Sequence, residues 1–207
     1  MKNMKKALLF FAFVAMAALL PASAAETAAS VLEKTAAKLS GAKTLSASFA
    51  MTANGRTVAG KLYVSGSKFA LTSDAMSTWF DGESQWTANH DTKEVNIIEP
   101  SAEEIAQSNP LSVVDNYKSD FTYKLLSSAS GTYSVQLTPK DKTAPWSKVV
   151  LNVSAKTWFP SSVIATMRDG TVVNTKITDV QAGINIPAQQ FVFNKNAFPG
   201  YEIIDFR

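Results

Sequence analysis

The chain lacks cysteine altogether and has a single histidine among its 207 residues. Without cysteine it has no disulfide, no thiolate metal site, no cysteine nucleophile and no N-terminal cysteine to carry a lipid. One histidine also excludes a metal site built from several imidazoles. We therefore expect neither a metal nor any other cofactor.

Patterns typical of catalytic and phosphate-binding sites are missing as well. The glycines stand singly, so the chain has no glycine-rich phosphate loop. His90 neighbours Asp91, but both lie in a run of turn-forming residues, and no nucleophile-elbow pattern accompanies them. Glu103 and Glu104 are adjacent, so they point to different sides of a helix. We predict an exposed turn histidine and no enzyme, a hydrolase of envelope lipids being the least favoured function.

Charged residues make up only 18% of the chain, 20 of them basic and 17 acidic. Three lysines stand among the first six residues, before an apolar run of 14 residues from Ala7 to Leu20. A membrane-spanning helix needs about 20 apolar residues, so this run is too short for one. Because Pro21 and Ala22-Ser23-Ala24 follow it, we interpret residues 1–24 as a secretory signal peptide that is cleaved near Ala24.

Cleavage removes three basic and no acidic residues, so residues 25–207 contain 17 of each. A neutral chain with no cluster of basic residues is not expected to bind nucleic acid, and its net charge gives it no attraction for a membrane. We expect a monomer in the periplasm that carries no lipid anchor of its own.

The apolar periodicity predicts one mainly β domain with a few helices (α+β) over residues 25–207. A helix is expected over 27–39, with Ser30 and Glu33 as a capping box and Gly41 as its stop. Alternation with a period of two predicts a meander of strands over 44–98 and further strands over 121–180, with a strand-like segment at 191–193. Two short helices are expected between them, at 101–107 and 110–117. A sheet of about ten strands must curl, and a curved antiparallel sheet packed against helices fits best.

Ten apolar side chains fall at alternate positions of the first strands, and we expect them to share one face of the sheet. They are Phe49, Met51, Leu62, Val64, Phe69, Leu71, Trp79, Trp86, Val95 and Ile97. They form either a filled core or the wall of an apolar cavity, as in small β-barrels that hold hydrophobic ligands. Periodicity alone does not separate the two, but a cavity in a secreted protein suits a lipid or another acyl-bearing molecule.

Several short motifs resemble the periplasmic outer-membrane lipoprotein carrier family, LolA. Their order and spacing extend over essentially all of residues 25–207. They are Gly60-Lys61-Leu62-Tyr63-Val64, Phe80-Asp81-Gly82-Glu83-Ser84-Gln85-Trp86, Asn109-Pro110-Leu111, Leu137-Thr138-Pro139-Lys140 and Phe191-Val192-Phe193 followed by Pro199-Gly200 and Ile204-Asp205.

The resemblance implies an unclosed β-barrel of antiparallel strands with helices covering its concave face. It also implies a carrier that takes acylated lipoprotein from an inner-membrane ATP-binding-cassette release complex, holds its acyl chains in an apolar cavity and delivers it to an outer-membrane acceptor. The two short central helices are then the expected lid, with Ile105, Leu111, Val114 and Tyr117 as its residues and Leu111 and Val114 on its inner face. Partial burial of the acyl chains keeps release possible, because each fully buried methylene contributes about 0.8 kcal/mol.

One feature departs from the family. The loop that holds the lid with an arginine in well-known members is Ser65-Gly66-Ser67 here, followed by Lys68. The latch is therefore absent or built differently, for example from Lys68. An envelope sensor or adaptor that binds lipid or protein on the same concave face is the alternative to a carrier.

Overall fold

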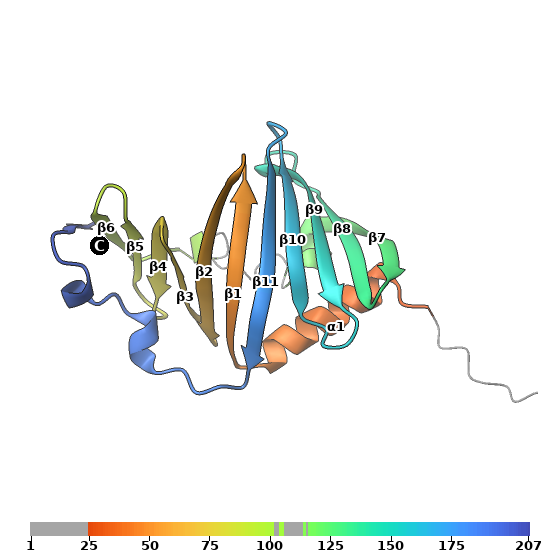
Figure 1. The fold of residues 1–207 in the computed structure, drawn as a ribbon, viewed down its shortest axis with the longest axis horizontal. Helices are drawn as coiled ribbons and strands as arrows, with labels where there is room; N and C mark the ends of the chain where they lie inside the picture. The colour runs from red at the N-terminus through yellow and green to blue at the C-terminus, as the bar shows by residue number, and fades with distance from the viewer. Residues whose placement is uncertain (1–24, 102–103, 106–113, 115) are drawn as a thin grey trace, which may run out of the picture.

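The computed structural model describes residues 25–101, 104–105, 114 and 116–207 (Figure 1). Its regular elements begin with helix α1 and include two 3₁₀ helices near the C-terminus. The elements are α1 (Ala28–Gly41), β1 (Thr44–Ala53), β2 (Arg56–Ser65), β3 (Lys68–Ser73), β4 (Met76–Phe80), β5 (Gln85–Asn89), β6 (Glu94–Ile98), α4 (Tyr117–Asp120), β7 (Phe121–Ala129), β8 (Thr132–Pro139), β9 (Trp146–Ser154), β10 (Pro160–Met167), β11 (Val172–Ala182), η1 (Ala188–Phe191), η2 (Lys195–Ala197) and β12 (Glu202–Asp205).

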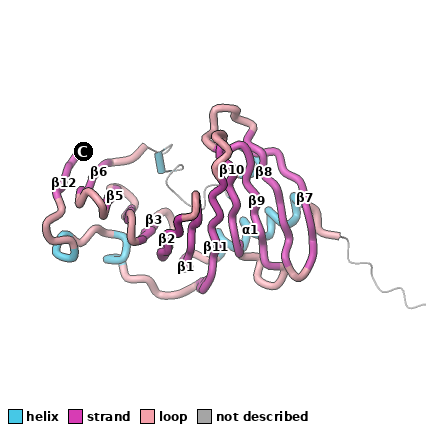
Figure 2. The backbone as a smooth tube through the Cα atoms, turned by 45° about the horizontal axis from the view of Figure 1, so that its top comes forward, coloured by secondary structure: helices cyan, strands magenta, loops and turns pink. Residues whose placement is uncertain are grey.

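All twelve strands form one sheet in the order β12-β6-β5-β4-β3-β2-β1-β11-β10-β9-β8-β7. The sheet is not closed, since β7 and β12 are its two edges. Neighbouring strands are antiparallel, as predicted, except that β12 lies parallel to β6. The pairing of β1 with β11 joins the first strands of the chain to the late ones and makes them the centre of the sheet. The predicted mainly β, unclosed and curved sheet is confirmed (Figure 2).

Helix α1 confirms the predicted opening helix and its start, but the predicted capping box and C-terminal stop are wrong. Thr27 is the N-cap: its hydroxyl accepts from the Ser30 N–H at 3.1 Å, and the Ser30 hydroxyl accepts from the Thr27 N–H at 2.8 Å. Because Thr27 is the N-cap, Ser30 is the third helical residue and forms the capping box with Thr27, so Glu33 is not part of it. At the other end Gly41 is still helical, and Lys43 takes the left-handed conformation with a φ of 53°.

The capping box predicted for residues 101–104 is confirmed. The Ser101 N–H donates to Glu104 Oε2 at 2.8 Å, and the Glu104 N–H donates to Ser101 Oγ at 3.3 Å. Most of the helix predicted at 110–117, together with Asn109-Pro110, lies outside the described residues. Phe191-Val192-Phe193 is not a strand, because Pro187 starts a 3₁₀ turn in which the Gln190 N–H donates to the Pro187 carbonyl at 3.0 Å.

Two apolar clusters lie on opposite sides of the sheet. We call the side on which α1 packs the inner face and the other side the outer face; Figures 1 and 2 are seen from the outer face, with α1 behind the strands. The inner cluster contains Val31 and Leu32 of α1 with Val135, Leu137 and Leu151 of the sheet. The outer cluster is built on β3–β6 and is covered by the segment that follows β11. Its buried members are Ala70, Trp79, Ala88, Val95 and Phe191.

Candidate functional site

The ten predicted cavity residues do not share one face. Directly paired residues of neighbouring strands lie on the same side of a sheet. Phe69 pairs with Phe80, whereas Trp79 pairs with Ala70, which puts Trp79 on the opposite side from Phe69. Strands β5 and β6 continue this arrangement, because Trp86 pairs with both Trp79 and Ile97, and Ala88 pairs with Val95. These residues therefore lie on the same side of the sheet as Trp79.

Trp79, Trp86, Val95 and Ile97 therefore lie on the outer face, and the prediction of a single face is wrong for these four. The reason is the register of the turn between β3 and β4, where Thr72 pairs with Ser77. A shift of one residue in such a turn moves every following side chain to the other face, and the apolar pattern of the sequence does not specify that register.

An aromatic cover lies over these outer-face residues. The Trp79 ring is 5.5 Å from both the Phe193 and the Phe198 ring. His90 stacks on Phe198 at 5.8 Å, and its two ring nitrogens are 2.9 Å from Ser77 Oγ and 3.0 Å from Tyr201 Oη. His90 lies in a turn, as predicted, but it is half-buried and not exposed, because the C-terminal segment folds back and attaches to the sheet through this ring.

The other six predicted residues lie on the inner face of β1–β3: Phe49, Met51, Leu62, Val64, Phe69 and Leu71. Their burial differs. Phe69 is fully buried beside Phe80, with ring centroids 5.6 Å apart. Met51 is 39% exposed, and the remaining four are half-buried. The inner face of β1–β3 is thus apolar but incompletely covered, and we call it the open half.

Gly60 shapes the open half by letting an aromatic ring cross β2. Gly60 pairs with Phe49. A Cβ added at Gly60 would lie 2.1 Å from the Thr72 carbonyl oxygen and 2.5 Å from Phe49 Cζ. The bare backbone of Gly60 is therefore what permits the Phe49 ring to lie against the sheet. Gly60 is the first residue of the sequence motif Gly60–Val64, but the sequence did not show that the Phe49 ring is the group that needs a glycine there.

The inner face of β7–β10 is covered instead, and we call it the covered half. Val31 and Leu32 of α1 are fully buried, as are Val135 and Leu137 of β8 beneath them. Burial of apolar area of this kind contributes about 25 cal/mol per Å² to stability. No equivalent helix among the described elements lies over the open half.

The predicted lid residues differ in how deeply they are buried. Val114 is 5% exposed and Tyr117 is 3% exposed, and both belong to the inner cluster next to α1 and β7. Ile105 is half-buried, and Leu111 lies outside the described residues. Lys68, considered as a latch, extends toward the β4–β5 turn, where its Cε would be 3.8 Å from a Cβ on Gly82.

Among the described residues, two polar atoms of the inner cluster are buried and have no hydrogen-bond partner. They are the Tyr117 hydroxyl and the Trp146 indole N–H. Tyr117 is held in place by an edge-to-face contact with Tyr123, with ring centroids 5.5 Å apart. An unsatisfied buried donor lowers stability, and no sequence pattern identifies it in advance.

The carboxyl groups with shifted pKa values lie at turns, beside helix ends and at the end of β12, and none is on β1–β3. Hydrogen bonds from the Ser101 backbone N–H and hydroxyl lower the pKa of Glu104. The Arg207 guanidinium and backbone N–H lower the pKa of Asp205 to about 2. These shifts favour ionised surface carboxylates and provide no general acid at the open half. Within the described ranges, no group of three or more metal-ligating side chains could hold a metal ion.

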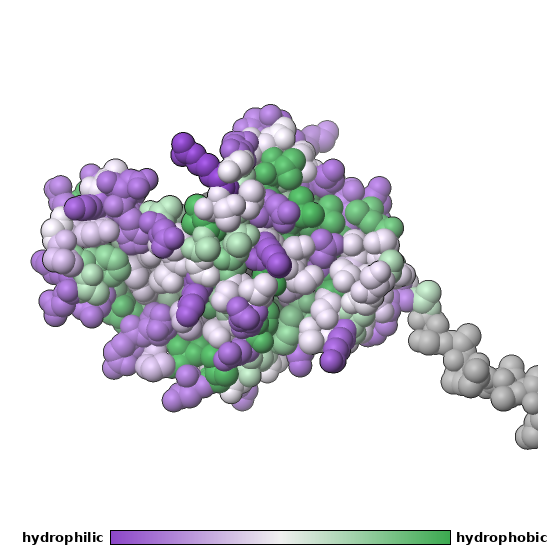
Figure 3. Space-filling model, in the orientation of Figure 1, coloured by the Kyte–Doolittle hydropathy of each residue, from purple (hydrophilic) through white to green (hydrophobic). Residues whose placement is uncertain are grey.

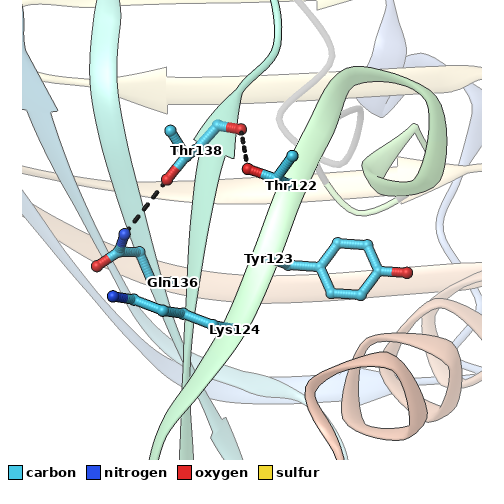
Figure 4. A pocket seen from close by; sticks show the side chains of 5 residues that line it. All are labelled: Thr122, Tyr123, Lys124, Gln136 and Thr138. Atoms are coloured by element: carbon cyan, nitrogen blue, oxygen red, sulfur yellow. Dashed lines mark hydrogen bonds between the residues drawn. The ribbon is translucent and has the colours of Figure 1, made fainter.

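A separate polar hollow of about 250 Å³ lies beside β7 and β8 (Figure 4). Thr122, Lys124, Gln136 and Thr138 line it, and the Gln136 side-chain N–H donates to Thr138 Oγ1 at 3.2 Å. Tyr123 points to the other side of the sheet, toward α1, so the hollow is open to the outer face (Figure 4).

A family model described as outer membrane lipoprotein carrier protein LolA matches residues 20–171, which is most of the chain. The chain belongs to the LolA family. The match includes the whole open half, from β1 to β3, and ends just before β11. No curated protein sequence matches this chain.

Solved structures with low sequence identity are similar in fold. An uncharacterised conserved protein from Thermus thermophilus has a TM-score of 0.58 at 10% identity, covering 86% of this chain and 98% of that chain. A LolA superfamily protein from Nitrosomonas europaea has a TM-score of 0.42 at 16% identity, covering 82% and 99%. The MucA/MucB complex of Pseudomonas aeruginosa has a TM-score of 0.44 at 15% identity, covering 81% and 61%. At these identities the first likeness supports the fold alone.

Among the described residues, no helix is both long enough and apolar enough to cross a membrane.

Proposed function

We propose that this LolA-family protein is a non-catalytic periplasmic carrier that holds acyl chains of a lipoprotein or another lipid against the open half. The observation that carries the proposal is the contrast in burial on one continuous face. In the covered half Val135 and Leu137 are fully buried under α1 and only the flanking apolar side chains are half-buried, whereas in the open half Met51 is 39% exposed and four of its apolar neighbours are half-buried. Apolar surface that the fold leaves incompletely covered is typical of a ligand site.

The proposed ligand contacts are the accessible inner-face residues Phe49, Met51, Leu62, Val64 and Leu71, with Ile105, Leu111 and Val114 as lid. The mechanism is reversible burial. Each methylene removed from water contributes about 0.8 kcal/mol, so a partly covered face retains a chain without making its release prohibitively slow. Catalytic groups are not required for this cycle. Loading from an inner-membrane release complex and delivery to an outer-membrane acceptor complete the proposed transport.

The first experiment compares two neighbouring residues on opposite faces of β1. Met51→Glu places a charge on the open half at a side chain that is already exposed, so folding is expected to tolerate it. Thr52→Glu adds the same charge on the outer face. We expect Met51→Glu to weaken binding of a fluorescent fatty acid at least tenfold, because a carboxylate would have to be buried beside the acyl chain. Thr52→Glu should bind like the unmodified protein.

Equal binding by both variants would exclude the open half as the site. Mass spectrometry of organic extracts from the purified protein provides the second readout. Acylated molecules in stoichiometric amount are expected. The absence of both extracted lipid and fatty-acid binding would contradict the carrier. A carrier also moves a labelled lipoprotein from donor to acceptor membranes, whereas a sensor or adaptor on the same face does not.

A further inference from the structure

The formal neutrality of residues 25–207 hides a segregation of charge. Residues 74–104 and 183–207, which include β4–β6, β12 and the C-terminal segment, contain 10 acidic and 3 basic residues. Residues 25–73 and 105–182 contain 7 acidic and 14 basic residues. The expectation of no electrostatic attraction for a membrane was based on the net charge, which is the sum over these two parts and not the charge of either one.

Four of these 14 basic residues lie on the outer face of seven adjacent strands, β2, β1, β11, β10, β9, β8 and β7. We call this surface the basic face. Every second strand carries one outward lysine: Lys61 on β2, Lys176 on β11, Lys148 on β9 and Lys124 on β7. Neighbouring strands are about 4.8 Å apart, so these strands are spaced by roughly 10 Å.

The four lysines are exposed, and none forms an ion pair with a described residue. Asp179, at an irregular position of β11, is the only acidic residue within these seven fully described strands. Their positive charge is therefore not neutralised locally. Figure 3 shows this side of the molecule, where separate hydrophilic side chains stand among residues of intermediate hydropathy and small hydrophobic patches.

Short polar side chains occupy much of the surface between the lysines. Ser134 Oγ donates to Asn152 Oδ1 at 2.6 Å, and Asn152 Nδ2 donates to Ser162 Oγ at 2.8 Å, which joins β8, β9 and β10. Tyr63 is the only outward aromatic residue in the seven strands, and it packs against the outer cluster. Protein interfaces are enriched in aromatic residues and arginine and depleted in lysine and serine. This composition does not fit a protein partner, but it fits a layer of hydrated anionic groups.

The polar hollow adds a place where such a group can sit. It opens on the basic face next to Lys124 and is lined by the Gln136 amide and the hydroxyls of Thr122 and Thr138. The Thr122 hydroxyl already donates to the Thr138 carbonyl and a Gln136 N–H to Thr138 Oγ1, so the Lys124 ammonium is the main donor left for a ligand in this space of about 250 Å³. A phosphate ester with its glycerol matches this donor in charge.

We propose that the basic face docks on the surface of a bilayer containing anionic phospholipid. The contact is electrostatic and shallow, since the lysines reach headgroups while the strands remain outside the hydrocarbon. One lysine near an anionic surface changes the partition coefficient about fivefold. Four lysines give a reversible attachment that disappears near 0.5 M salt, where the Debye length falls to roughly 4 Å.

The experiment measures co-sedimentation of the chain from Ala25, which contains every described helix and strand, with vesicles. Starting at Ala25 removes the leader, whose lysines and apolar run would themselves bind vesicles. Vesicles with a quarter of phosphatidylglycerol in phosphatidylethanolamine are compared with pure phosphatidylcholine. We expect binding to the anionic vesicles alone. Combined replacement of Lys61, Lys124, Lys148 and Lys176 by glutamine should lower the partition coefficient at least a hundredfold.

The matched control replaces four exposed lysines outside the basic face with glutamine, namely Lys43, Lys93, Lys156 and Lys195. It has the same net charge as the test variant and should keep most of the binding. Equal loss in both variants would mean that net charge alone is responsible, and it would overturn the proposal. Equal binding to both kinds of vesicle, no binding to either, or retention by nucleic acid in place of vesicles would also overturn it. Fatty-acid binding at the open half is measured separately and does not depend on this result.

Discussion

The covered half and the open half of the inner face have similar side chains but different neighbours. In the covered half, Val135 and Leu137 lie under α1 and are inaccessible to water. In the open half, Leu62 and Met51 are just as apolar, yet they remain half-buried and exposed respectively. The difference shows that apolar content does not decide how deeply a residue is buried, whereas the cover above each residue does.

The first and largest predicted effect comes from shortening one leucine in each half. Leu137→Ala should lower the free energy of unfolding by about 3 kcal/mol, because it leaves a cavity in a closed core. Leu62→Ala should lower it by about 1 kcal/mol, because its surroundings are already accessible to solvent. Urea denaturation followed by tryptophan fluorescence measures both. A loss of stability as large for Leu62→Ala as for Leu137→Ala would show that the two halves are equally closed.

The same two variants should rank in the opposite order when fatty-acid binding is measured in place of stability. Leu62→Ala should weaken binding, while Leu137→Ala should leave it unchanged under conditions where the protein is folded. Reduced binding by both variants would contradict the separation of core from site.

A second prediction concerns the cover on the outer face. His90→Ala removes hydrogen bonds to Ser77 and Tyr201 and a stacking contact with Phe198. We expect a loss of about 1–2 kcal/mol and faster hydrogen exchange in residues 186–205, since the C-terminal segment loses its attachment. Asp91→Ala, at the neighbouring turn, is the control. Unchanged exchange in His90→Ala would show that the aromatic rings alone hold the segment.

The smallest predicted effect is a gain of stability. Tyr117→Phe removes a buried hydroxyl without a partner, and we expect an increase of up to about 1 kcal/mol in the free energy of unfolding. Thermal denaturation of the lipid-free protein measures it. A decrease would mean that the hydroxyl has a partner in solution, and the covered half would then contain a polar site that its apolar burial does not indicate.

Local patterns in the sequence determined the elements. Alternating residues predicted the strands, Asn54-Gly55 lies at the tight turn between β1 and β2, and Ser101 with Glu104 formed the expected capping box. These signals depend on residues a few positions apart, so the sequence alone contains them. The family motifs and the unclosed curved sheet were likewise accessible from the sequence.

Only the tertiary structure decided which face each side chain occupies and what covers it. The register after β3 places Trp79 and Trp86 on the outer face. The C-terminal segment returns to the sheet and attaches to it through the turn residue His90. The four outward lysines of the basic face likewise share one surface only because seven strands lie side by side in the sheet. Register and long-range docking depend on contacts between residues as far apart as His90 and Tyr201, and the one-dimensional pattern does not specify them.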